Sequence, residues 1–347
     1  MMKIRIYRGI LLSFFLISCS FSEDAYAGKK KTKDEQITLK IGSWNIFTSD
    51  SRKNNIKSNP DVSTQRYWGN SCVAVADAII ANDWDVVGFQ EVCDSIWGRS
   101  GNYGIQKLVE DKGGNYEWFI LSNSNPKDPI YGKINYAAAL AWKKDRFSIM
   151  DYGIYWITGN YDKPQRASDA EYGSSNRHCL WVKLKEKKSG KKFYYMSTHF
   201  SVTMFNDKND NTKRVYYPKA VEDNARYLVT YADEVVVADD VPSIIVGDMN
   251  LTETEQEKAY GYLCSRRWKD AYYLAEDAGL LGETIKACRS SVNQKDESSL
   301  AIWKPDHIFV DGVEVLSYDV DQEKYPTRDG TLHYPSDHMP LTAEIRF

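Results

Sequence analysis

The chain has 347 residues, 42% of them hydrophobic, and a formal net charge of -3 at pH 7. This length and apolar content support a large core. The charge excludes a generally basic nucleic-acid binder, although a local groove can be basic on an acidic protein. After the first residues, no segment is long and apolar enough to cross a membrane.

Residues 1–27 have the pattern of an export signal. Three basic residues precede the short apolar run GILLSFFLIS, which is too short to be a permanent membrane anchor. Two processing sites fit: LISC, ending at Cys19, resembles a lipobox whose cysteine is lipidated, and AYA, ending at Ala27, resembles a conventional cleavage site. We favour lipidation because Cys19 follows the apolar run directly. Either site predicts export, as an outer-membrane or cell-surface lipoprotein or as a periplasmic or secreted protein.

The polar, charged segment 28–36 is predicted to be a linker, and periodic segments begin after it. Alternation of apolar and polar residues, or a short continuous apolar run, predicts a strand. Apolar residues spaced so that they fall on one face of a helix predict a helix. We expect strands within 37–47, 83–92, 137–142, 179–185, 192–200, 242–250, 304–312, 313–320 and 339–347. We expect helices over 64–80, 219–238 and 253–264, and polar loops over 123–135, 160–176, 206–217 and 289–299.

Strands and helices are interspersed, which predicts an α/β or α+β class. Polar residues capable of chemistry stand where the expected strands begin or end, from the first strand to the last. Because one site would then draw on the whole length, we expect a single domain over 37–347 rather than the two that length alone allows. Each residue taken singly could cap a turn or lie on the surface, but together they predict one site: Asn45, Glu91, His199, Asp248, Asn250, Asp306, Asp337 and His338.

These residue types suit metal-assisted attack of water on phosphorus. A hard divalent cation prefers oxygen ligands, and Glu91 and Asp337 are suitable donors with Asn45 nearby. Asp248 or a histidine can orient the water and accept its proton, and Asn250 can donate hydrogen bonds to a nonbridging oxygen.

A histidine held by a carboxylate keeps one tautomer and can carry positive charge in the transition state. Asp306 is the candidate partner of His338.

Six short motifs, in chain order, resemble the endonuclease/exonuclease/phosphatase superfamily, which includes pancreatic deoxyribonuclease, abasic-site endonucleases, neutral sphingomyelinases and inositol-phosphate phosphatases. They are SWNIF, FQEV, STHF, GDMN, DHIF and PSDHMPL. The stretch YWITGNYDKP followed by NRHCLWVKL is also similar to a family feature, a loop before an arginine-bearing strand. The resemblance covers about residues 37–347. It implies an α/β four-layer sandwich, with two mixed β-sheets face to face, helices on the outside and the active site across one rim.

The resemblance also implies roles for the residues that match. Asn45 and Glu91 would lie at a metal ion with Asp337 near it, the ion being Mg²⁺ or else Mn²⁺ or Ca²⁺. Asp248 would orient or deprotonate the attacking water.

In the same family pattern, Asn250 and His199 would contact the phosphate, and Arg177 would reach it as well. His338, supported by Asp306, would stabilise the phosphorane-like transition state. One departure concerns the acidic residue that supports the first histidine in many members. Asn135 or Tyr136 stands there in this chain, which leaves the support of His199 open.

We therefore expect an exported, divalent-metal-dependent phosphodiesterase, with nucleic acid as the first substrate hypothesis. A sphingomyelinase-like or phospholipase C-like lipid phosphodiesterase is the next hypothesis, and a phosphomonoesterase acting on sugar or inositol phosphates follows. A non-catalytic binding protein is disfavoured because buried carboxylates without a partner would be costly. No obligate protein partner is implied, and a lipidated Cys19 would anchor the chain to a membrane.

Overall fold

In the computed structural model, residues Gln36–Phe347 form one compact unit. The structure describes residues 36–46, 68–92, 104–120, 137–159, 161, 177–201, 204–206, 214–216, 218–236, 240–251, 257–281 and 305–347. The expected export signal with Cys19, nearly all of the linker, and most of the loops expected at 123–135, 160–176 and 289–299 lie outside these residues. Among the described helices, none has the length and apolar character needed to span a bilayer.

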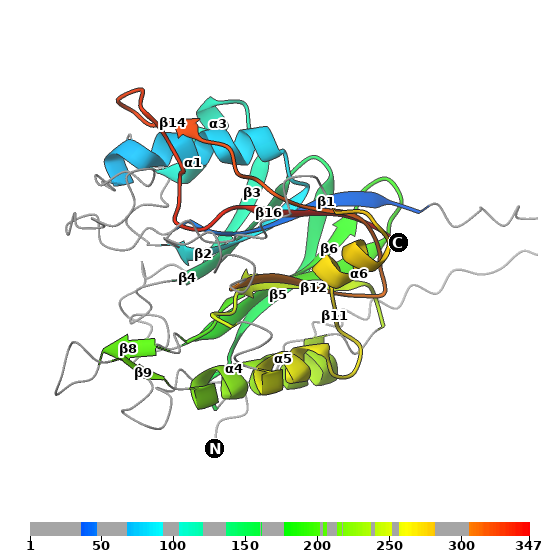
Figure 1. The fold of residues 1–347 in the computed structure, drawn as a ribbon. Helices are drawn as coiled ribbons and strands as arrows, with labels where there is room; N and C mark the ends of the chain where they lie inside the picture. The colour runs from blue at the N-terminus through cyan, green and yellow to red at the C-terminus, as the bar shows by residue number, and fades with distance from the viewer. Residues whose placement is uncertain are drawn as a thin grey trace, which may run out of the picture. The chain divides into compact units, whose positions relative to one another are not determined.

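Two six-stranded sheets form the centre of the unit (Figure 1). In the first, sheet A, β1 runs parallel to β2 and antiparallel to β16, so the sheet is mixed. The strands of sheet A, in spatial order, are β13 (Glu314–Val320), β16 (Leu341–Arg346), β1 (Thr38–Asn45), β2 (Val86–Val92), β4 (Ala137–Lys143) and β3 (Tyr116–Ile120).

The second sheet, sheet B, is also mixed, because β10 runs parallel to β7 and antiparallel to β12. Its strands, in spatial order, are β11 (Lys269–Asp270), β12 (Asp306–Asp311), β10 (Ser243–Asp248), β7 (Lys192–His199), β6 (His178–Glu186) and β5 (Phe147–Trp156). Two small hairpins complete the described strands: β8 (Met204–Asn206) with β9 (Arg214–Tyr216), and β14 (Tyr325–Pro326) with β15 (Leu332–His333).

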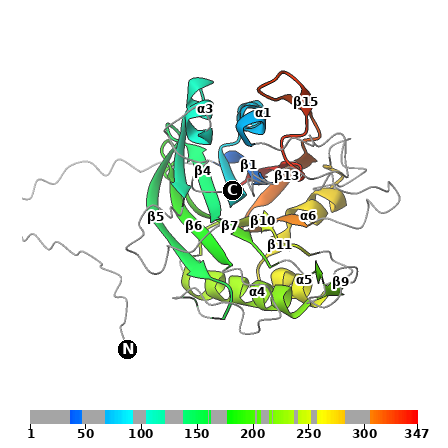
Figure 2. The ribbon, with the colours of Figure 1, turned by 90° about the vertical axis from the view of Figure 1, so that its left-hand side faces the viewer.

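Helices lie on the outer faces of both sheets, which confirms the four-layer sandwich expected from the sequence (Figure 2). Apolar side chains of α1 (Trp68–Asn82) and α3 (Ile105–Asp111) pack on sheet A. Those of α4 (Pro218–Tyr231), its π-helical continuation η1 (Ala232–Val236) and α5 (Glu257–Cys264) pack on sheet B. The short α6 (Ala271–Asp277) contributes Ala271 and Ala275 to the core between the sheets.

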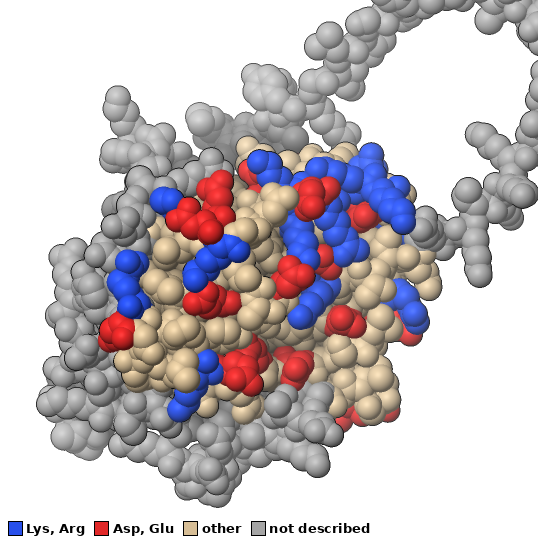
Figure 3. Space-filling view, turned by 90° about the horizontal axis from the view of Figure 1, so that it is seen from above, with Lys and Arg blue, Asp and Glu red and all other residues tan. Residues whose placement is uncertain are grey.

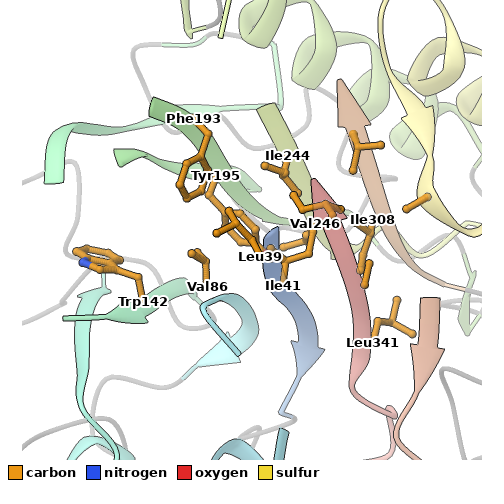
Figure 4. Close-up of a cluster of buried hydrophobic side chains, with 14 of the residues drawn as sticks. Leu39, Ile41, Val86, Trp142, Phe193, Tyr195, Ile244, Val246, Ile308 and Leu341 are labelled. Atoms are coloured by element: carbon orange, nitrogen blue, oxygen red, sulfur yellow. The ribbon is translucent and has the colours of Figure 1, made fainter. Parts of the chain in front are cut away.

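The core between the sheets ends at the residues predicted to carry chemistry. Strand side chains alternate between the two faces of a sheet. Leu39 and Ile41 of β1 lie in the inter-sheet core with Ile244 and Val246 of β10 (Figure 4). Every second residue of a strand faces the same side, so Asn45 points to the same side as Ile41. For the same reason Asp248 points to the same side as Val246. The polar ends of these strands therefore form the rim of an otherwise apolar interior.

A glycine allows the two sheets to approach closely just below this rim. A Cβ added at Gly88 of β2 would meet Val246 Cγ2 at 2.5 Å and Ser197 Cβ at 2.9 Å. The buried side chain of Gln90 donates to Ser197 Oγ at 3.1 Å, which links the sheets two residues further along β2. Sheet A and sheet B are thus tied together next to the rim.

Some elements were not expected from the sequence, among them β3, β5, α3 and α6. In addition, part of the loop expected at 206–217 forms the hairpin strands β8 and β9. The expected helix over 219–238 is α4 followed by the π-helical η1. These elements are short or irregular, and β5 contains a bulge between Ile149 and Asp151, so the apolar spacing along them lacks a regular period.

Candidate active site

One edge of sheet B places three of the predicted residues side by side. His199 ends β7, Asp248 ends β10 and Asp306 begins β12. The strand register pairs Asp248 with His199 on one side and with Asp306 on the other. Residues paired in register point to the same face of a sheet, so the three side chains converge. All three are buried.

Sheet A supplies Asn45 and Glu91 opposite this edge. Asn45 ends β1 and is fully buried. Glu91 lies where the pairing of β2 with β4 shifts between Phe89 and Val92, and its φ is 55°. A bulge of this kind redirects a side chain away from the regular pleat. A positive φ is uncommon for a residue with a long side chain, and such strain concentrates at functional sites.

The turn before β16 is fixed by Ser336. Its hydroxyl donates to Asn45 O at 2.6 Å and accepts from His338 N at 3.2 Å. It also lies 3.3 Å from Asp337 Oδ1. On the other side, the Trp44 indole donates to His338 O at 2.9 Å. The turn that carries Asp337 and His338 is therefore held against the end of β1.

The side chains from the two sheets meet at Asp248. Asn45 Nδ2 donates to Asp248 Oδ2 at 2.9 Å, and His338 Nε2 lies 3.8 Å from the same oxygen. The other ring nitrogen of His338, Nδ1, lies 2.7 Å from Asp306 Oδ2. The imidazole of His338 thus stands between two carboxylates of sheet B.

These contacts set the charges at the rim. Burial alone would lower the pKa of His338, but the carboxylates of Asp306 and Asp248 raise it well above the ordinary histidine value. Burial raises the pKa of Asp248 to about 6, and the positive charge of His338 opposes that rise. These shifts favour a charged imidazolium beside the carboxyl groups of sheet B.

Glu91 and Asp337 form a second concentration of negative charge. Burial, followed by the charge of Asp337, raises the pKa of Glu91 to about 7. Hydrogen bonding to Asn45 favours the charged form of Glu91. Two crowded carboxylates beside an amide provide the oxygen ligands that hard divalent cations prefer. A cation there would relieve the repulsion that raises the pKa, so these residues fit a divalent-metal site.

Asp248, Asp306 and His338 also bring three potential ligand atoms within 4.8 Å of one another. This group fits a metal less well. The carboxylates of Asp306 and Asp248 raise the pKa of His338 despite its burial, which favours the protonated ring. A protonated ring nitrogen cannot ligate a metal. The charge of the imidazolium already offsets part of the charge of the two carboxylates. The cation therefore fits better on the Glu91 and Asp337 side of the rim.

Arg177 and His199 lie on the sheet B side of the same rim. The charges of Glu91 and Asp248 act on the Arg177 guanidinium, although burial lowers its pKa. Burial and the charge of Arg177 hold the pKa of His199 well below its usual range, so this ring is neutral. Its Nε2 lies 3.4 Å from Asp248 Oδ2, and its Nδ1 has no hydrogen-bond partner among the described residues. Asn135 and Tyr136, which stand where many family members carry a supporting acid, lie outside those residues.

Asn250 is adjacent to the site through its backbone. Its N–H donates to Asp248 Oδ1 at 3.0 Å, and its φ of 47° turns the chain after β10. One N–H of its side-chain amide donates to Phe200 O at 3.1 Å. The amide group has a second N–H, which can serve a ligand.

Three residues that shape the site had no role expected from the sequence: Trp44, Ser336 and His178. His178 is buried at the start of β6, and its Nε2 accepts from Ala138 N of sheet A at 3.4 Å. Its only sequence signal is its place next to Arg177. His307, in contrast, is buried on the other side of β12, where its Nδ1 lies 3.0 Å from Asp270 Oδ2.

A family model, that of the Endonuclease/Exonuclease/phosphatase family, matches residues 42–338, from within β1 to His338. The chain belongs to the endonuclease/exonuclease/phosphatase family. Members of this family are phosphoesterases, and the match confirms the resemblance found in the sequence motifs. A search of curated proteins gave no match.

Solved structures share the fold of this family member. An endonuclease/exonuclease/phosphatase family protein from Bacteroides thetaiotaomicron is 21% identical, with a TM-score of 0.64, and the match covers 90% of this chain and 99% of that one. A mannosyl-6-phosphatase from the same organism is 22% identical, with a TM-score of 0.62 and coverage of 89% and 100%. TDP2 from D. rerio, complexed with a single-strand DNA product, is 17% identical, with a TM-score of 0.57 and coverage of 89% and 98%. At these sequence identities, the similarity shows only that this chain has the same fold.

Proposed function

We propose that this family member is a divalent-metal-dependent phosphoesterase in which water attacks phosphorus at the rim between the two sheets. The observation that carries the proposal is the position of the His338 imidazolium, 2.7 Å from Asp306 and 3.8 Å from Asp248. A fixed positive charge beside a buried carboxylate suits a reaction that moves a proton from water and builds negative charge on phosphoryl oxygens.

Each of these groups has a role that its contacts support. Asp248 orients the attacking water and accepts its proton, since its pKa of about 6 lies near neutrality. His338, kept charged by Asp306, donates a hydrogen bond to a phosphoryl oxygen. Asn250 and neutral His199 hold further oxygens of the phosphate.

Arg177 adds a positive charge on the substrate side, where the carboxylates of Glu91 and Asp248 already attract it.

Asn45, Glu91 and Asp337 would hold the cation. When bound there, the ion would polarise a phosphoryl oxygen and offset the charge that develops on it. Carboxylate and amide oxygens select Mg²⁺, Mn²⁺ or Ca²⁺ over metals that prefer nitrogen or sulfur ligands.

The first substrate we propose is nucleic acid, whose phosphodiester bonds the enzyme would hydrolyse. The sequence motifs resemble a superfamily that includes deoxyribonuclease and abasic-site endonucleases, and the fold is shared with a protein complexed with single-strand DNA product. A nuclease would show a steep loss of binding as salt rises, because phosphate contacts release counterions.

A sugar phosphomonoester is the second candidate. The chain aligns with the whole length of a mannosyl-6-phosphatase, at a slightly higher identity than with TDP2. A monoesterase would release inorganic phosphate without shortening a nucleic acid.

We also propose that the protein is exported and anchored through a lipidated Cys19, as the pattern LISC suggests. Mass spectrometry of the protein from its native membrane fraction tests this. Acyl chains on an N-terminal Cys19 are expected, whereas a mature terminus after Ala27 would favour soluble secretion.

An assay over four substrates tests the function: single-strand DNA, RNA, a mannose 6-phosphate monoester and a generic aryl phosphodiester. Each is incubated with Mg²⁺ or with chelator, using the wild type and the His338→Ala variant. Hydrolysis that needs both Mg²⁺ and His338 is expected. Equal hydrolysis in chelator, or by the variant, would contradict the proposal, and the preferred substrate decides between the two candidates.

A further inference from the structure

A cluster of basic side chains lies at the end of the domain away from the active site. We call it the basic turn patch and define it as residues 144–146, between β4 and β5, together with residues 185–192, which run from the end of β6 through the turn into β7. Seven of these residues are Lys or Arg, and two are Asp or Glu. On the face seen in Figure 3, Lys and Arg are densest toward the upper right, the end at which β1 starts in Figure 1.

Hydrogen bonds hold the two segments of the patch together. Lys187 N donates to Arg146 O at 3.0 Å, and Lys187 Nζ donates to Lys144 O at 2.8 Å. Of the two acidic residues, Glu186 is buried and accepts from Ser189 N at 2.5 Å. Arg146 is paired with Asp85, whose Oδ2 lies 2.6 Å from Arg146 Nη1. The patch has six lysines, and the only exposed acidic residue within it is Asp145, so its exposed charge is mainly positive. Like charges this close repel each other, and an anionic partner relieves that repulsion.

Exposed apolar side chains adjoin the patch. β5 begins directly after Arg146, and its side chains Ile149, Met150 and Tyr152 are 43%, 50% and 60% exposed. They are three of the five exposed large hydrophobic side chains among the described residues. Basic charge beside apolar side chains is the combination that binds an anionic bilayer, because the charges attract the headgroups and the apolar groups enter the interface.

The patch also lies where the chain enters the domain. Arg146 Nη2 donates to Thr38 O at 2.7 Å, so the patch touches the start of β1. Asn45, at the other end of β1, is part of the active site. An eight-residue strand spans roughly 25 Å, which separates the patch from the site.

We propose that the basic turn patch, with Ile149, Met150 and Tyr152, docks the domain on an anionic phospholipid bilayer. The docking does not depend on lipidation of Cys19, although such an anchor would join the domain at this same end.

Vesicle flotation tests the docking without any activity measurement. The protein is residues Gln36–Phe347, which contain the complete core and lack the apolar run near the N-terminus. It is mixed with vesicles of phosphatidylcholine alone or of phosphatidylcholine with phosphatidylglycerol. Binding to the anionic vesicles, and its loss at high salt, are expected. No binding, or equal binding to both kinds of vesicle, would overturn the proposal.

Charge reversals then locate the surface. Lys187→Glu with Lys188→Glu should lower the ratio of bound to free protein by at least roughly 25-fold, about fivefold for each lysine. The matched control is Lys107→Glu with Lys258→Glu, two exposed lysines of α3 and α5 whose reversal should change the ratio far less. Equal loss in both double variants would show that net charge, and not this surface, drives binding.

Two further experiments test whether a bilayer is the partner of this surface. Met150→Ser with Tyr152→Ser should lower vesicle binding several-fold, because apolar side chains lose their place in the interface. Unchanged binding by that variant would overturn the apolar part of the proposal. If the lysine reversals at 187 and 188 weaken binding to duplex DNA while vesicle binding stays constant, the surface is a nucleic-acid site and the proposal is wrong.

Discussion

His338 Nδ1 lies 2.7 Å from Asp306 Oδ2, although the two residues are 32 positions apart and belong to different sides of the sandwich. Asp306 begins β12 in sheet B, and His338 precedes β16 in sheet A. The contact therefore depends on the packing of one sheet on the other. The same packing brings Asn45 of sheet A within 2.9 Å of Asp248 in sheet B.

Asp306→Asn should remove the charge that keeps His338 protonated. The carboxylate of Asp306 is the foremost group raising the pKa of His338, so the variant's imidazole should titrate at lower pH, as followed by nuclear magnetic resonance. The rate of hydrolysis should fall about 10²- to 10⁴-fold. Asp277→Asn, at the exposed end of α6, is the control. An unchanged titration of His338 would show that Asp306 does not set its charge.

Glu91→Gln should abolish Mg²⁺-dependent hydrolysis and change how stability depends on pH. The pKa of Glu91 is raised from 4.5 to about 7 in the fold, so its contribution to stability is complete below about pH 4.5 and is lost as the pH rises through 7. For cation-free wild type, that loss is up to roughly 3 kcal/mol, and Glu91→Gln should remove it. Denaturant unfolding across this pH range, with and without Mg²⁺, provides the measurement. Identical pH profiles for the two proteins would contradict the assignment.

Gly88→Ala should destabilise the domain, because the added methyl group would stand 2.5 Å from Val246 Cγ2 between the sheets. We expect a loss of about 1–3 kcal/mol in the free energy of unfolding, as for other overpacked cores. Gly261→Ala in α5 is the matched control, since a Cβ there meets nothing within 4 Å. That variant should gain up to about 1 kcal/mol from helix propensity. Similar Tm values for both variants would argue against close packing at Gly88.

Ser336→Ala should lower kcat more than its effect on stability explains. The hydroxyl fixes the backbone of Asn45 and of His338 by hydrogen bonds of 2.6 and 3.2 Å. Losing a buried hydrogen bond costs about 1–3 kcal/mol, which a Tm measurement would register. If kcat is unchanged while Tm falls, Ser336 stabilises the fold without positioning the site.

The sequence predicted residues that the fold brings together at the rim, because strand ends are visible in it. Short apolar runs that stop at Asn45, Asp248 or Asp306 mark the places where side chains leave the core. The number and placement of these ends predict that they meet in one site. The order of the strands required the family resemblance, since strand order within a sheet does not show in local periodicity. The motif order supplied the two-sheet arrangement, which the structure confirms.

What the sequence could not supply was local geometry. The bulge and positive φ that redirect Glu91 arise from pairing of β2 with β4, which are far apart in the chain. The short α6 depends on an N-cap by Asp270, whose side chain accepts from Tyr272 N, and seven residues are too few to show a helical period. The link from His178 to Ala138 joins two sheets and leaves no local pattern.

Anomalous diffraction from crystals soaked in Mn²⁺ is the most direct measurement of the central claim, because it locates the ion without reference to any substrate. A single strong peak bound by the carboxylates of Glu91 and Asp337 is expected, and it should vanish in Glu91→Gln crystals. A peak held instead by Asp248, Asp306 and His338, or full occupancy in the variant, would contradict the account.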